Sequence, residues 1–80
     1  MVAINLWASL SRFTDGARVV EVQAETIAQA LAALVAAHPG LGPILEGGVS
    51  VVVDGEIVPS RHAPLAPGAE VFLLQQIKGG

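Results

Sequence analysis

The last two residues of the chain, Gly79 and Gly80, are its clearest candidates for chemistry. Glycine has no Cβ, so a glycine pair can pass through a narrow channel and adopt backbone angles that other residues avoid. The carbonyl of a terminal glycine is also unhindered toward an attacking group. Proteins can capture an extended C-terminus through its main-chain hydrogen bonds. Such an end suits a carboxylate at Gly80 that reacts in a partner's pocket, with Gly79 allowing it to enter. Taken alone, the pair favours an unused chain end.

Side chains that could catalyse a reaction are few. The chain has no cysteine, and His38 and His62 have no ligand partners at a spacing typical of a metal site. The serines lack the setting of a hydrolase nucleophile, and no glycine-rich loop precedes a helix as in phosphate-binding proteins. We expect no metal site, no cofactor bound by this chain and no catalysis of its own.

The charge balance excludes several partner classes. The net charge is −3, and the only cationic side chains are Arg12, Arg18, Arg61 and Lys78, which do not cluster. Nucleic-acid binding requires a basic surface. The longest weakly polar stretch, residues 28–37, is too short to span a bilayer, and no signal peptide precedes it. We expect a cytoplasmic protein that binds neither nucleic acid nor membranes.

The composition predicts one small domain with a protein partner. Eighty residues form a single core, so residues 1–80 are expected to be one domain. Apolar residues make up 52% of the chain and charged residues only 14%, which is less charge than most soluble proteins carry. We infer that part of the apolar surface is kept for an interface.

The central element is a helix that begins at Thr26. Thr26 and Gln29 have the spacing of a capping box, and apolar residues follow at helical intervals. Pro39 and Gly40 end the helix, because the residue before a proline avoids helical angles. Residues 41–45 are expected to form a loop or a short helical turn.

Strand signals surround this helix. Apolar residues alternate from Val2 to Trp7, β-branched residues are frequent elsewhere, and Asp54-Gly55 is a strong hairpin signal. The predicted strands are residues 2–7, 18–22, 49–53, 56–58 and 70–74, with a long connection at 9–17 and an extended tail at 75–80. This order predicts an α+β roll in which a mixed sheet of about five strands packs on one helix.

The order of elements, followed by Gly-Gly, resembles the β-grasp fold of ubiquitin-like proteins and, more closely, the MoaD/ThiS family of bacterial sulfur carriers. Five segments resemble motifs of molybdopterin synthase small subunits: Leu6-Trp7-Ala8-Ser9-Leu10, Thr26-Ile27-Ala28-Gln29-Ala30-Leu31, His38-Pro39-Gly40-Leu41, Val53-Asp54-Gly55-Glu56 and Leu65-Ala66-Pro67-Gly68-Ala69-Glu70-Val71. Two positions depart from that pattern. Gln75-Gln76 replaces a usual proline pair, and Ala69 replaces a usual acidic residue.

The resemblance implies chemistry at the C-terminus that partner proteins carry out. A ubiquitin-activating-type adenylyltransferase uses ATP and Mg to adenylate the Gly80 carboxylate. Sulfur from a donor protein then replaces AMP, and the resulting thiocarboxylate gives its sulfur to a product through an acceptor-side synthase subunit or enzyme. Molybdopterin is the first expected product. Thiazole, cysteine or a specialised thiolated metabolite are alternatives.

A docking face is expected on the side of the sheet away from the helix. Trp7, Phe72 and Leu74 alternate with residues of the expected core, so they should project from that side, where Ile57 or Val58 could join them. The resemblance implies that partners dock there, and we add Ile77 and Lys78 of the tail as contacts. In an alternative interpretation, the loop at residues 59–67 buries Trp7.

Two functions other than sulfur transfer are compatible with these residues. The chain could be a ubiquitin-like modifier joined to target proteins through Gly80, because the same activation serves both uses. Lys78 is the only lysine, so polymeric chains built on the folded body are excluded. The chain could also be a passive β-grasp interaction module with an unused C-terminus.

Overall fold

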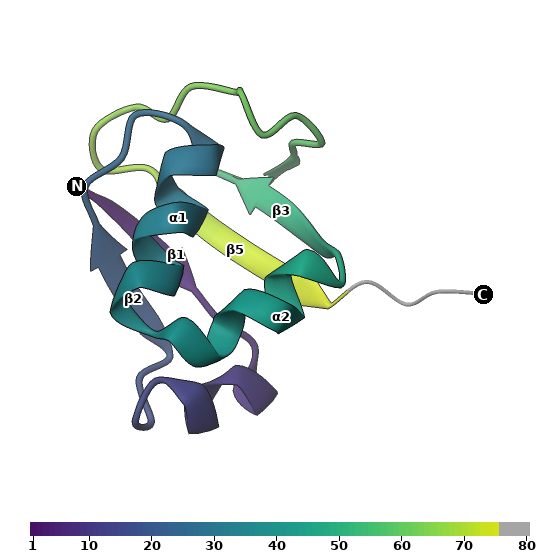
Figure 1. The fold of residues 1–80 in the computed structure, drawn as a ribbon. Coiled ribbons are helices and arrows are strands. Elements are labelled where there is room, and N and C mark those ends of the chain that lie inside the picture. Colours follow the sequence, from purple (N-terminus) through teal and green to yellow (C-terminus); the bar gives the residue numbers. More distant parts are fainter. Residues whose placement is uncertain (76–80) are drawn as a thin grey trace.

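The computed structural model describes residues 1–75 and contains a mixed sheet with the strand order β2-β1-β5-β3-β4. Helix α1 crosses one face of this sheet, and the short helix α2 lies beside it (Figure 1). Two 3-10 helices, η1 and η2, complete the regular structure. The elements are β1 (Val2–Asn5), η1 (Ala8–Phe13), β2 (Val19–Val22), α1 (Ile27–Ala37), η2 (Pro39–Leu41), α2 (Gly42–Glu46), β3 (Val49–Val53), β4 (Glu56–Ile57) and β5 (Glu70–Gln75).

The first and last strands lie side by side at the centre of the sheet. β1 and β5 run parallel, with Ala3 opposite Glu70 and Asn5 opposite Phe72. The pairs β1–β2, β3–β4 and β3–β5 are antiparallel. This is the predicted α+β arrangement, and the β-grasp fold of ubiquitin-like proteins is confirmed.

The capping box predicted for α1 is present with one change. The Thr26 hydroxyl accepts a hydrogen bond from the Gln29 amide at 3.2 Å. The Gln29 side chain reaches back one residue further than expected and accepts from the Glu25 amide at 2.8 Å. The helix ends at Ala37, and His38 is its C-cap, as Pro39 predicts.

One side of the sheet and the helices share a continuous apolar core. Alternate residues of β1, β3 and β5 face α1, and Leu6 after β1 and Leu10 of η1 join them. Packing a helix on one face of a sheet leaves the other face free to hold a different kind of surface. The largest fully buried side chains are Ile4, Leu10, Ile27, Leu34, Leu41 and Leu73.

Four predicted strand boundaries were wrong. β2 begins at Val19 rather than Arg18, and β4 ends at Ile57 rather than Val58. The other two differences have a structural reason. β1 ends at Asn5 rather than Trp7, because η1 begins at Ala8 and turns the chain so that Leu10 enters the core. β5 continues through Gln75, which was assigned to the tail, because β3 still offers Val49 as a pairing partner. The expected connection at residues 9–17 therefore contains a 3-10 helix, and the short helical turn expected at 41–45 is α2.

Candidate docking face and chain terminus

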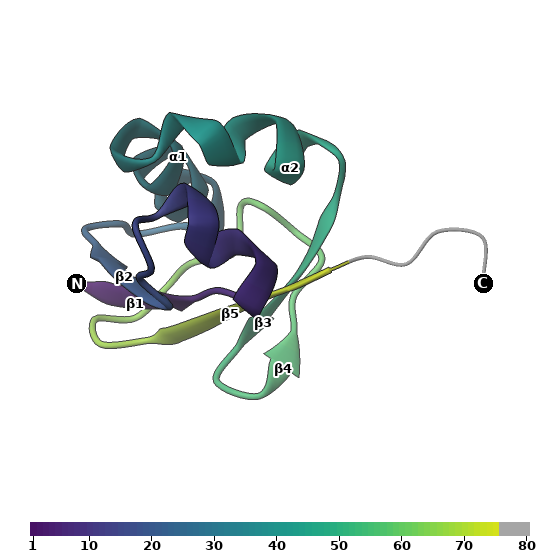
Figure 2. The same cartoon turned by 90° about the horizontal axis from the view of Figure 1, so that it is seen from below.

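The face of the sheet opposite α1 carries the candidate site. Both α1 and α2 lie on one side of the sheet, and in residues 1–75 no helix covers the other side (Figure 2). Side chains on successive strand residues point to opposite faces, so the burial pattern of β5 separates Val71 and Leu73 in the core from Phe72 and Leu74 outside. Phe72 is 39% exposed and Leu74 is 47% exposed.

Strand register places apolar side chains in one row across the open face. Phe72 of β5 is opposite Asn5 on one side and Val52 on the other. The row continues to β2, where Val19 is opposite Asn5, and to β4, where Ile57 is opposite Val52. Asn5 is the one polar member, and its side-chain amide donates a hydrogen bond to the Val71 carbonyl at 3.1 Å. We call Trp7, Val19, Val52, Ile57, Phe72 and Leu74 the open-face patch.

A shallow groove of about 400 Å³ brings three of the predicted contacts together. Trp7, Phe72 and Leu74 all line it, beside Val19 and Arg18. Trp7 is half-buried and packs against the core from the rim of the groove. The loop at residues 59–67 does not bury it. That loop instead bonds to the start of α1, where the Ile27 amide donates to the Ala63 carbonyl at 3.1 Å.

The two candidates on and after β4 have different environments. Ile57 is 73% exposed and ends the apolar row. Val58 is half-buried, packs against the core and donates its amide to the Val51 carbonyl at 2.8 Å. Of the two, only Ile57 belongs to the open-face patch.

The described part of the chain ends with β5, at Gln75. Gln75 is opposite Val49 and follows Leu74, the last residue of the open-face patch in the chain. The Arg61 guanidinium lies near this point and donates to the Val49 carbonyl at 3.3 Å. The candidates Ile77, Lys78, Gly79 and Gly80 lie outside the described residues.

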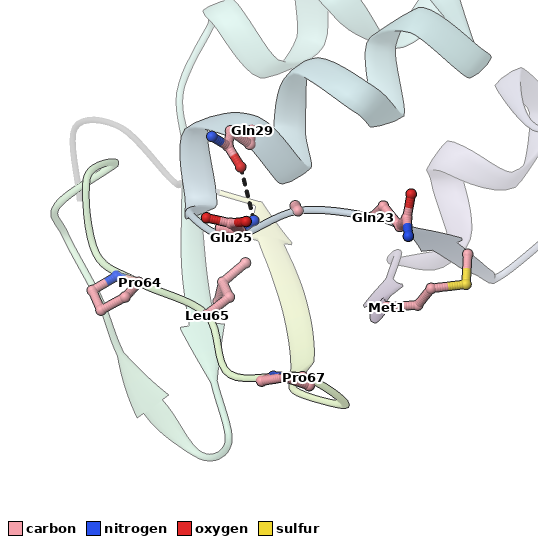
Figure 3. A pocket seen from close by; sticks show the side chains of 8 residues that line it. Met1, Gln23, Glu25, Gln29, Pro64, Leu65 and Pro67 are labelled. Carbon is pink, nitrogen blue, oxygen red and sulfur yellow. Dashed lines mark hydrogen bonds between the residues drawn. The ribbon is translucent and has the colours of Figure 1, made fainter.

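A second hollow, of about 700 Å³, lies at the other end of the molecule, near the N-terminus (Figures 1 and 3). Some of its polar groups bond to one another. Gln29 accepts from the Glu25 amide, and the Leu65 amide donates to the Glu25 carbonyl at 2.8 Å. Met1 borders the hollow beside the start of β5, about 20 Å of strand away from Gln75 at 3.3 Å per residue. This hollow is therefore remote from Gln75, the last described residue.

Groups that would indicate another kind of site were not found in the described chain. Residues 1–75 contain no group of three or more histidines and acidic residues placed to hold a metal ion. Within the same residues, no helix has the length and apolar character needed to cross a membrane.

Sequence reasoning missed several residues of this face. Val19, Val52 and Asn5 belong to the row, and Arg18 lines the groove, but none was a candidate. Glu21, the one polar residue of β2, contained a signal for Val19, because residues two apart in a strand share a face. It could not be used without knowing which strand pairs with which.

Residues 4–80 match the ThiS family. SAMP1 from Haloferax volcanii, a small archaeal modifier protein, is 30% identical, with a TM-score of 0.76, covering 99% of this chain and 98% of that one. The comparison with curated protein sequences gave no match.

Two solved complexes contain chains with the same fold at lower identity. The Amycolatopsis orientalis BexX/CysO complex matches at 20% identity and a TM-score of 0.82, covering 100% of both chains. The complex of subunits 1 and 2 of the Helicobacter pylori molybdopterin-converting factor matches at 19% identity and a TM-score of 0.71, covering 99% of this chain and 97% of that one.

The fold and the matched family agree on the class of protein. The structure is a ubiquitin-like β-grasp domain whose last strand leads to a C-terminal diglycine. The chain belongs to the ThiS family, and the resemblance to the MoaD/ThiS sulfur carriers is confirmed.

Proposed function

We propose that this chain is a sulfur carrier whose Gly80 carboxylate is activated by a partner enzyme and converted to a thiocarboxylate. The observation that carries the proposal is a family match over residues 4–80 in a chain that ends in Gly79-Gly80. The chain supplies the acyl group and the surface that presents it. It is a co-substrate of its partners and not an enzyme.

The proposed chemistry balances as three displacements. A Gly80 carboxylate oxygen attacks the α-phosphorus of ATP, with Mg held by the partner enzyme, and pyrophosphate leaves. The terminal sulfur of a donor persulfide then attacks the acyl carbon and AMP leaves. A thiol cleaves the resulting acyl disulfide, which releases the thiocarboxylate and forms a new disulfide. Glycine at the reacting position leaves the carboxylate free to approach the phosphorus and the acyl carbon open to the sulfur.

The open-face patch supports a role in docking. Phe72, Leu74 and Ile57 are large apolar side chains that remain exposed on a small domain, and such patches mark protein interfaces. The patch adjoins the end of β5, so a partner bound there would lie next to Gln75, which precedes the last five residues of the chain. Two related folds were solved in complexes with other proteins, which favours the same use here.

Intact-mass analysis tests the carrier function. The chain is incubated with ATP, Mg, a persulfide donor and the ubiquitin-activating-type enzymes of its own organism, and the mass of the C-terminal peptide is measured. We expect exchange of one oxygen for sulfur at Gly80, preceded by an AMP adduct. A variant that lacks Gly79 and Gly80 should show neither change.

The outcome separates the carrier from a passive module. If the shortened variant supports the same cellular function as the full chain, the terminus is unused. If no activating enzyme yields an adduct with the full chain, the carrier proposal fails.

Conjugation to proteins is a second candidate, favoured by the 30% identity to SAMP1 over nearly the whole chain. The same acyl-adenylate would then react with a target lysine and release AMP. Digestion of cellular proteins should in that case yield lysines that carry residues from this C-terminus. A carrier without conjugating activity yields none.

The product that receives the sulfur is a further part of the proposal. Molybdopterin is the first candidate product, and thiazole, cysteine or a specialised thiolated metabolite are the alternatives. The supply of ATP and the absence of cysteine in the chain favour a cytoplasmic setting. Metabolite analysis of a strain that lacks the gene identifies the product by its loss.

A further inference from the structure

Acidic side chains form a second row on the open face, next to the apolar row. Glu21 of β2 and Glu70 of β5 flank Ala3 of β1 in register. Both glutamates are exposed and point to the same side as Val19 and Phe72, because they are two residues away along their strands. Adjacent strands are about 4.8 Å apart, so the two Cα atoms are separated by about 10 Å.

A third carboxylate lies beside this row. Asp54 of the β3–β4 turn accepts a hydrogen bond from the Glu70 amide at 3.2 Å. Asp54 also donates its own amide to the Glu70 carbonyl at 3.1 Å, which fixes the turn against the start of β5. We call Glu21, Asp54 and Glu70 the acidic row.

The arginines of the described chain lie elsewhere. Arg18 lines the groove near Trp7, and Arg61 donates to the Val49 carbonyl near the end of β5. Arg12 lies over the Phe13 ring in η1. The charge on the open face is therefore asymmetric. Its carboxylates lie near the start of β5, and Arg18 and Arg61 border it near the end of β5.

We propose that the acidic row binds basic side chains of the activating partner and so fixes which way round the carrier docks. The inference rests on the proposed function and adds the chemistry of the partner surface. The partner has an apolar site for the open-face patch and lysine or arginine side chains for the acidic row. Those cations lie about 17 Å from the partner atoms that contact Gln75, because Glu70 and Gln75 are five strand residues apart at about 3.3 Å per residue.

The physical need for such a row follows from the shape of the apolar patch. Val19, Phe72 and Ile57 form a nearly straight row across the sheet, and apolar contact is non-directional. A partner bound to this row alone could be rotated by half a turn, which would point the terminus away from the active site. Charges placed on one side of the row raise the energy of the reversed orientation.

A double substitution with a matched control tests the inference. Glu21→Gln with Glu70→Gln removes two negative charges from the open face and leaves Asp54 in its turn. Glu25→Gln with Glu46→Gln removes two negative charges from exposed positions before α1 and at the end of α2. Both variants have the same net charge. Association rates and ATP–pyrophosphate exchange are measured with the activating enzyme at low and high salt.

We expect the open-face variant to associate roughly tenfold more slowly than wild type at low salt, with the difference shrinking at high salt as the charges are screened. The control should stay near the wild-type rate. Equal rates for the two variants would overturn the inference, and so would a docked complex whose partner has no basic side chain opposite Glu21 or Glu70.

The failure of the inference can be distinguished from that of the proposed function. If wild type is adenylated and the two variants behave alike, only the role of the acidic row is wrong. If wild type is not adenylated, the proposed function itself fails. Self-association of the carrier through the open face, seen as a concentration-dependent mass in sedimentation, would also overturn the inference, because the face would then serve a second copy of the chain and not the activating enzyme.

Discussion

The side-chain amide of Asn5 donates a hydrogen bond of 3.1 Å to the main-chain carbonyl of Val71. This bond connects the last residue of β1 to the neighbouring parallel strand, where the ladder between β1 and β5 stops at Phe72. Beyond it, β1 leaves the sheet toward Trp7, and β5 continues against β3 alone. Asn5 thus interrupts the apolar row while it holds the two central strands together.

Replacing Asn5 with alanine should lower the free energy of unfolding by about 1 kcal/mol, because the half-buried Val71 carbonyl loses a hydrogen bond. For a domain of this size, that corresponds to a fall in melting temperature of about 4–8 °C. Chemical denaturation and calorimetry measure both values. An unchanged stability would mean that water replaces the amide without cost.

Replacing Phe72 with alanine should weaken binding of the activating enzyme by roughly 10- to 30-fold, because a large aromatic anchor is lost from the middle of the row. Phe13→Ala is the matched control, since Phe13 is 38% exposed and Phe72 is 39% exposed. Phe13 lies on η1, close to Gly40 on the helix side of the molecule. Calorimetric titration gives both dissociation constants, and equal losses would count against the open face as the docking surface.

Replacing Asp54 with valine should destabilise the fold by about 2 kcal/mol. Asp54 has a φ of 49°, which a β-branched residue adopts only with strain, and its carboxylate accepts from the Glu70 amide. Asp54→Asn keeps an oxygen acceptor and tolerates the left-handed angle, so its stability should stay within about 0.5 kcal/mol of wild type. Urea unfolding compares the two variants, and a tolerated valine would contradict the strain argument.

Replacing Gly80 with valine should reduce adenylation by roughly 100-fold, because a branched side chain crowds the reacting carbonyl and misplaces it in the partner's site. The apolar core is built from residues between Val2 and Leu73, so the melting temperature should not change. Pyrophosphate release reports the rate of activation. Full activity of this variant would remove the physical reason given for a terminal glycine.

The sequence alone was enough to predict the order of the elements and the class of fold. Local signals determine these features. A capping box starts α1, a proline ends it, and Asp54-Gly55 closes a hairpin, and each signal acts through residues that are neighbours in the chain. The terminal diglycine is likewise a local feature, and it needs no fold to be recognised.

Only the tertiary structure decided which strands are neighbours, and with that the composition of the open face. Val19, Asn5, Phe72, Val52 and Ile57 come from five strands, and their alignment depends on a parallel pairing between the first and last strands. No local signal specifies such a long-range register. The same pairing brings Glu21 and Glu70 to one side of the row, although they are far apart in the chain.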